Sequence, residues 1–119
     1  MLFNRHLEQK REIPKGFLTT FEMTRKKPMT LDELYQIIED RKRSGSKDSY
    51  VVSLFQKGRD RIAQKIGEEA TEVVIAVKNR RKKEVIEEMA DLWFHTLIMM
   101  SSLDIKPKDI FDEFERRKK

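Results

Sequence analysis

The stretch KIGEEATEVVIA, residues 65–76, places Glu68, Glu69 and Glu72 inside an apolar helical run. A second stretch, EEMADLWFHTLIMM at 87–100, embeds Glu88 and Asp91 in one of the most apolar segments of the chain. Residues three or four apart are neighbours on a helix surface, so the acids of each stretch can converge. Burying an unpaired carboxylate costs several kcal/mol. Two helices packed antiparallel across a short loop would bring four of these acids (Glu69, Glu72, Glu88 and Asp91) together.

Clustered carboxylates of this kind are typical of a metal site. All-oxygen ligation suits hard cations such as Mg²⁺ or Mn²⁺, and the chain has no cysteine to supply a thiolate. His95, one turn after Asp91, is better explained as a hydrogen-bonded core histidine than as a ligand. For the first stretch alone, a solvated acidic face neutralised by Arg61 and Lys65 is an equally good explanation. The recurrence of paired acids in the second stretch favours a metal site.

Hydrophobic periodicity predicts an all-α protein. TLDE at 30–33 forms a capping box with Thr30 as N-cap, and the loop after this helix starts near Gly45. Long helices are expected over about 60–78 and 84–103 and a last helix from Pro107, while YVVSLFQKG from residue 50 is a short helix or a turn. These elements predict an antiparallel bundle of about four helices. The expected core includes Val73, Val74, Val77, Trp93, Phe94, Met99, Met100, Ile110, Phe111 and Phe114.

Composition limits the class of protein. The 119 residues suffice for one domain. No apolar run is long enough for a membrane span, and the polar N-terminus lacks a signal-peptide core, which predicts a cytoplasmic protein. Residues 1–28 hold seven basic and three acidic side chains, a net charge of +4 out of the total of +5. We therefore expect a basic extension at 1–28 and an all-α domain at 29–119.

The acids and their context resemble a known family. E-E-x-x-E at 68–72, followed by E-x-x-D at 88–91, is similar to the signature of the all-α nucleoside triphosphate pyrophosphohydrolases, the MazG-like group. The longer strings SYVVSLFQKGRDRIAQKIGEEATEVVIA and EEMADLWFHTLIMM resemble one branch, the phosphoribosyl-ATP pyrophosphohydrolases of histidine biosynthesis, over roughly residues 31–117. The basic extension at residues 1–28, called the leader below, is not part of this pattern. The zinc-binding cysteines of the cyclohydrolase that is often fused to this enzyme are also missing, so we expect the stand-alone enzyme.

The resemblance implies a Mg²⁺-dependent hydrolase that converts phosphoribosyl-ATP to phosphoribosyl-AMP and pyrophosphate. Glu68 would orient or deprotonate the attacking water. The implied metal ligands are Glu69, Glu72, Glu88 and Asp91. Basic side chains ahead of the acids would contact phosphate oxygens, with plain surface charge as the alternative; they are Lys57, Arg61 and Lys65.

Two other functions stay open at this point. A house-cleaning pyrophosphohydrolase of the same superfamily would act on ordinary or damaged nucleotides with the same metal site. A helical module could instead bind nucleic acid through the basic leader, but this leaves the embedded acids unexplained, since without metal they would repel phosphate. We expect neither a nucleic-acid nor a membrane partner. The helix at 84–103 is apolar around most of its circumference, which predicts completion of the bundle in a homodimer or larger assembly.

Overall fold

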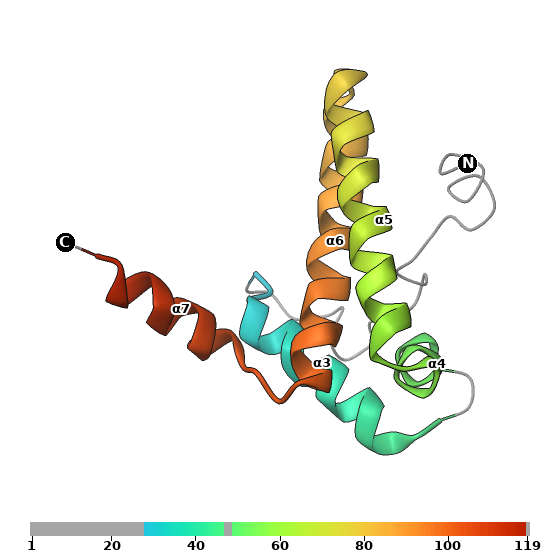
Figure 1. The fold of residues 1–119 in the computed structure, drawn as a ribbon, viewed down its shortest axis with the longest axis vertical. Helices are drawn as coiled ribbons and strands as arrows, with labels where there is room; N and C mark the ends of the chain where they lie inside the picture. Colours follow the sequence, from blue (N-terminus) through green and yellow to red (C-terminus); the bar gives the residue numbers. More distant parts are fainter. Residues whose placement is uncertain (1–27, 47–48, 119) are drawn as a thin grey trace. The chain divides into compact units, whose positions relative to one another are not determined.

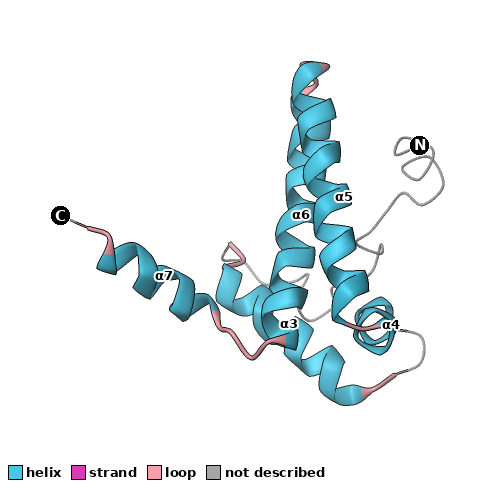
Figure 2. Ribbon diagram, in the orientation of Figure 1, coloured by secondary structure: helices cyan, strands magenta, loops and turns pink. Residues whose placement is uncertain are grey.

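The computed structural model describes residues 28–46 and 49–118, and the leader up to residue 27 lies outside this part. Five helices are formed: α3 (Leu31–Ser44), α4 (Tyr50–Lys57), α5 (Arg59–Lys78), α6 (Lys82–Ser102) and α7 (Pro107–Arg116). No strand occurs among these residues (Figure 2), and none of the helices in this part of the chain is long and apolar enough to cross a membrane. The all-α prediction is confirmed.

The chain divides into two compact units. The first includes Ala63–Thr96, and the second combines Met29–Ile62 with Leu97–Lys119. The first unit is an antiparallel hairpin in which α5 and α6 lie side by side (Figure 1). All five acids singled out in the sequence belong to this hairpin.

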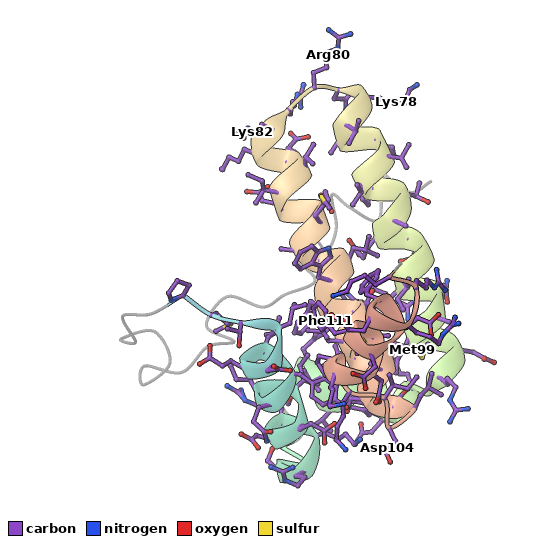
Figure 3. All side chains as sticks on the ribbon, turned by 90° about the vertical axis from the view of Figure 1, so that its left-hand side faces the viewer. Lys78, Arg80, Lys82, Met99, Asp104 and Phe111 are labelled. Atoms are coloured by element: carbon purple, nitrogen blue, oxygen red, sulfur yellow. The ribbon has the colours of Figure 1, made fainter. Side chains whose placement is uncertain are left out.

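A tight turn reverses the chain between α5 and α6. Arg80 adopts a left-handed conformation, with φ of 57°. Its N–H donates to Val77 O at 3.0 Å and the N–H of Arg81 donates to Ala76 O at 3.4 Å, which is the pattern of a Schellman C-cap. In Figure 3 the side chains of Lys78, Arg80 and Lys82 mark this end of the hairpin. The short turn fixes which turns of α6 face which turns of α5.

Helix caps and glycines set where the helices of the second unit begin and end. Thr30 Oγ1 accepts the N–H of Glu33 at 3.1 Å, and Glu33 Oε1 accepts the N–H of Thr30 at 3.0 Å, so the predicted capping box is confirmed. Gly45 ends α3 in a left-handed conformation. YVVSLFQK forms the helix α4, and Gly58 separates it from α5 with φ of 98°, a conformation that strains any residue with a Cβ.

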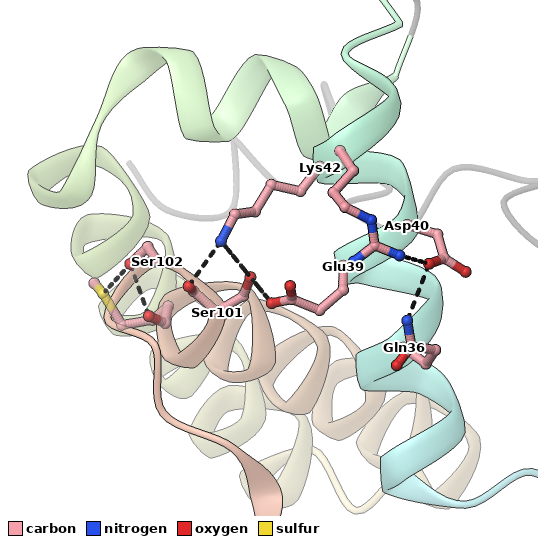
Figure 4. Close-up of polar contacts among 8 residues, drawn as sticks. Gln36, Glu39, Asp40, Lys42, Ser101 and Ser102 are labelled. Atoms are coloured by element: carbon pink, nitrogen blue, oxygen red, sulfur yellow. Dashed lines mark hydrogen bonds and ion pairs between the residues drawn. The ribbon is translucent and has the colours of Figure 1, made fainter.

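A partly buried polar network joins α3 to the end of α6 within this unit (Figure 4). Lys42 Nζ donates to the carbonyl oxygen of Ser101 at 3.0 Å and to its Oγ at 3.2 Å. Ser101 Oγ donates to Glu39 Oε2 at 2.5 Å, and Lys42 also lies 5.2 Å from the ring centroid of Phe55 on α4. The lysine is a second donor to this carbonyl oxygen, which also accepts the N–H of Asp104 at 3.2 Å, and its charge lies at the negative end of the α6 dipole.

Several residues expected in the core are exposed, so that part of the prediction is wrong. Val74, Val77 and Trp93 are exposed on the hairpin, whereas Phe94 and Met100 are buried as expected. On α7, Ile110, Phe111 and Phe114 are exposed, and Phe114 reaches 62%. Helical periodicity identifies the apolar side of a helix, but it does not supply the neighbour that covers it.

Candidate active site

The hairpin brings acidic side chains of both helices to one place. Glu69 stands on α5, and Glu88 and Asp91 stand one turn apart on α6. One carboxylate oxygen from each of these three residues lies within 4.8 Å of the others. We call these three residues the acid cluster. Its members are buried, with exposures of 0% for Glu69 and 5% for each of Glu88 and Asp91.

The remaining two predicted acids flank this cluster on α5. Glu72 is 5% exposed and lies one turn after Glu69, but it does not belong to the close set of three. Glu68 keeps part of its side chain in contact with solvent, with 17% exposed, and accepts a hydrogen bond from Gln64 Nε2 at 3.2 Å. Glu68 is therefore the acid that water can reach most directly.

Lys65 is the basic side chain associated with these acids. Its Nζ lies 3.6 Å from Glu68 Oε1 and 3.6 Å from Glu69 Oε2. The residue is 4% exposed, which is unusual for lysine. The sequence suggested it as a phosphate contact, whereas the structure pairs it with carboxylates. The spacing of i,i+3 and i,i+4 to Glu68 and Glu69 is the signal for this pairing.

His95 supports the acid cluster from within the same helix. It is fully buried, and its Nδ1 lies 2.7 Å from the carbonyl oxygen of Asp91. A carbonyl oxygen can only accept, so Nδ1 carries the proton in this contact. The ring also meets Phe94 edge-on, with centroids 5.3 Å apart. This environment is that of a hydrogen-bonded core histidine, as the sequence suggested.

The other two predicted phosphate contacts belong to the second compact unit. Lys57 is the last residue of α4 and is exposed, and Arg61 lies in the first turn of α5 and is partly exposed. The acid cluster and Lys65 belong to the hairpin. The structure thus brings Lys65 to the acids, and the roles of Lys57 and Arg61 stay predictions.

The donor set of the acid cluster fits a hard divalent cation. Three carboxylates from two helices supply anionic oxygen ligands, which Mg²⁺ and Mn²⁺ prefer. Three ionised carboxylates with oxygens within 4.8 Å of one another would repel each other, and a bound cation would remove this repulsion. A water or phosphate oxygen bound to such a cation would be activated for hydrolysis.

The sequence of this chain matches a known enzyme family. Residues 31–118 match the family model described as PRA-PH, phosphoribosyl-ATP pyrophosphohydrolase. Proteins named phosphoribosyl-ATP pyrophosphatase are similar, with 48% identity over 87 residues in Geobacter sulfurreducens, covering 73% of this chain and 81% of the relative. The relative from Methanocella arvoryzae is 47% identical over 91 residues, covering 75% of this chain and 96% of its own. The chain therefore belongs to the phosphoribosyl-ATP pyrophosphohydrolase family.

Proposed function

We propose that this protein hydrolyses phosphoribosyl-ATP to phosphoribosyl-AMP and pyrophosphate, an early step of histidine biosynthesis. The observation that carries the proposal is the family match over residues 31–118, which contains the whole acid cluster. Relatives that share about half of their aligned residues with this chain carry the name of this activity. The buried carboxylates supply the chemistry that such a reaction needs.

Glu69, Glu88 and Asp91 would hold Mg²⁺, or Mn²⁺ in its place, and Glu72 would complete the ligands from the next turn of α5. A divalent ion bound there supplies charge neutralisation for the triphosphate and lowers the pKa of a bound water. Glu69 and Glu88 reach the site from facing helices, so the hairpin holds the ligands in a fixed arrangement. Rigid ligand placement favours a phosphoryl transfer that depends on positioning and charge stabilisation.

Glu68 would act on the attacking water. Its carboxylate is partly accessible and belongs to the residue before Glu69, one of the proposed metal ligands. It would orient the water and accept its proton while the water oxygen bonds to the α-phosphorus. The bond between that phosphorus and the bridging oxygen then breaks, and pyrophosphate leaves. Lys57, Arg61 and Lys65 would contact the phosphate oxygens and offset their charge.

A substrate comparison tests the proposal. The purified chain is incubated in Mg²⁺ with phosphoribosyl-ATP, ATP and the common deoxynucleoside triphosphates, and pyrophosphate release is measured for each. We expect phosphoribosyl-ATP to have the highest kcat/KM and to yield phosphoribosyl-AMP. Preferential hydrolysis of ATP or a deoxynucleotide would instead assign the chain to the house-cleaning enzymes of the same superfamily.

The active form is further proposed to be a homodimer or a larger assembly. Exposed large apolar side chains occur along both helices of the hairpin; they are Val74, Val77, Ile86, Met89 and Trp93. Pairing the hairpins of two copies around a two-fold axis would cover such residues in a four-helix arrangement. Light scattering at micromolar concentration should report at least twice the chain mass of 14.3 kDa. A fully active monomer would contradict this assembly.

A further inference from the structure

Lys65 is a buried cation beside an acid cluster that is suited to bind another cation. Its side chain is 5% exposed, and its Nζ lies 3.6 Å from carboxylate oxygens of both Glu68 and Glu69. Removing a lysine ammonium from water is unfavourable unless anions compensate for the lost hydration. The two glutamates provide this compensation.

The Glu69 carboxylate lies close both to the Lys65 ammonium and to the other two acids of the cluster. Its Oε2 faces the Lys65 ammonium, and the same carboxylate belongs to the set of three within 4.8 Å. In the metal-free protein the ammonium reduces the repulsion between Glu69 and the two acids of α6. A divalent cation at the cluster would be repelled by that ammonium. It would also attract the Glu69 carboxylate more strongly than the singly charged ammonium does.

We propose that Lys65 is the resident counter-ion of the metal-free site and gives up Glu69 when the metal binds. The inference rests on the proposed binding of a divalent cation at Glu69, Glu88 and Asp91. The lysine stabilises the empty cluster and lowers its affinity for metal. Metal loading turns the ammonium away from Glu69, and this makes it available to an anionic oxygen of the substrate. Metal and triphosphate binding are thereby coupled through one side chain.

Variants of the full chain test this without relying on turnover. Lys65→Met removes the charge and keeps a long apolar side chain, and Lys65→Arg keeps the charge. Lys78→Met is the matched control, because it removes an exposed lysine from the far end of the same helix. Mn²⁺ affinity is measured by titration with the metal alone, and melting temperature is measured in chelator and in saturating Mn²⁺.

We expect Lys65→Met to bind Mn²⁺ about tenfold more tightly than wild type, within the usual range of coupling between two sites. Its melting temperature should fall in chelator and rise more than that of wild type on adding Mn²⁺. Lys65→Arg and Lys78→Met should bind Mn²⁺ much as wild type does. In a Glu69→Gln background, Lys65→Met should lose most of its effect on metal-free stability, because the partner carboxylate is neutral.

Equal or weaker Mn²⁺ binding by a folded Lys65→Met chain would overturn the inference while leaving the metal site intact. Failure of wild type itself to bind Mn²⁺ or Mg²⁺ would instead overturn the proposed metal site. If Lys65→Met does not fold, the exchange of partners can be tested by NMR spectroscopy of the wild-type chain with ¹⁵N-labelled lysines. The Lys65 side-chain signal, assigned by its loss in Lys65→Arg, should shift on adding Mg²⁺, and an unchanged signal would refute the exchange of partners.

Discussion

Replacing Glu88 by glutamine measures how much carboxylate repulsion the metal-free protein carries. The Glu88 carboxylate is buried and lies within 4.8 Å of those of Glu69 and Asp91. Two unit charges at such a separation repel by about 3.5 kcal/mol at an effective dielectric constant of about 20. Glu88 takes part in two of these pairs, so its charge is a large unfavourable contribution when no cation is bound.

Two effects reduce this contribution. An ordinary glutamate can take up a proton near neutral pH at a cost of about 4 kcal/mol, which limits the penalty. The ammonium of Lys65, 3.6 Å from Glu69, offsets a further part. We therefore expect Glu88→Gln to raise the free energy of unfolding by about 2 kcal/mol in chelator, equivalent to roughly 8 °C in melting temperature.

The assay is thermal unfolding of both chains in chelator and in Mg²⁺, followed by a turnover measurement. Mg²⁺ should raise the melting temperature of wild type but not that of Glu88→Gln, and the variant should be inactive. The control is Glu87→Gln, which changes the adjacent exposed residue and removes its ion pair with Lys83 at 3.5 Å. We expect this control to change the free energy of unfolding by less than about 0.5 kcal/mol. If Glu88→Gln melts at or below the wild-type temperature in chelator while the control is unchanged, the carboxylates are not in repulsive proximity.

Three further predictions address other parts of the molecule. A chain beginning at residue 29 should fold and keep its turnover, because Thr30 and Glu33 cap α3 locally; a severe loss of kcat in a folded truncation would show that the leader contributes to the site. Burial, followed by the nearby Glu39 carboxylate, raises the pKa of Tyr35 to about 12 from 10.0, so ultraviolet titration of the folded chain should show one tyrosine ionising late. Because the unfolded chain loses that proton first, this contribution to stability is complete below pH 10 and declines as pH rises through 12; coincident titration of both tyrosines at their ordinary pKa would contradict it. Trp93, the single tryptophan, is 52% exposed in the isolated chain, so Trp93→Glu should shift the mass in light scattering toward the monomer, and an unchanged mass would remove Trp93 from the interface.

Local sequence patterns account for the helices and for the choice of site residues. The capping box at Thr30 and the stop at Gly45 depend on contacts within one turn of the chain, so they could be predicted from the residues alone. The i,i+3 spacing of Glu88 and Asp91 likewise follows from helix geometry. The family resemblance predicted from E-E-x-x-E and E-x-x-D is confirmed by the match over 31–118.

The sequence by itself therefore determined that the chain is helical, which faces of the helices are acidic, and to which family it belongs. The tertiary structure decided that Glu69, and not Glu72, forms the close set with Glu88 and Asp91, and that Lys65 is buried against Glu69. It also decided that Val77, Trp93 and Phe114 stay exposed within one chain. These features depend on how far one helix is rotated and shifted along its neighbour. Helical periodicity leaves that rotation and shift undefined, because it describes each helix alone.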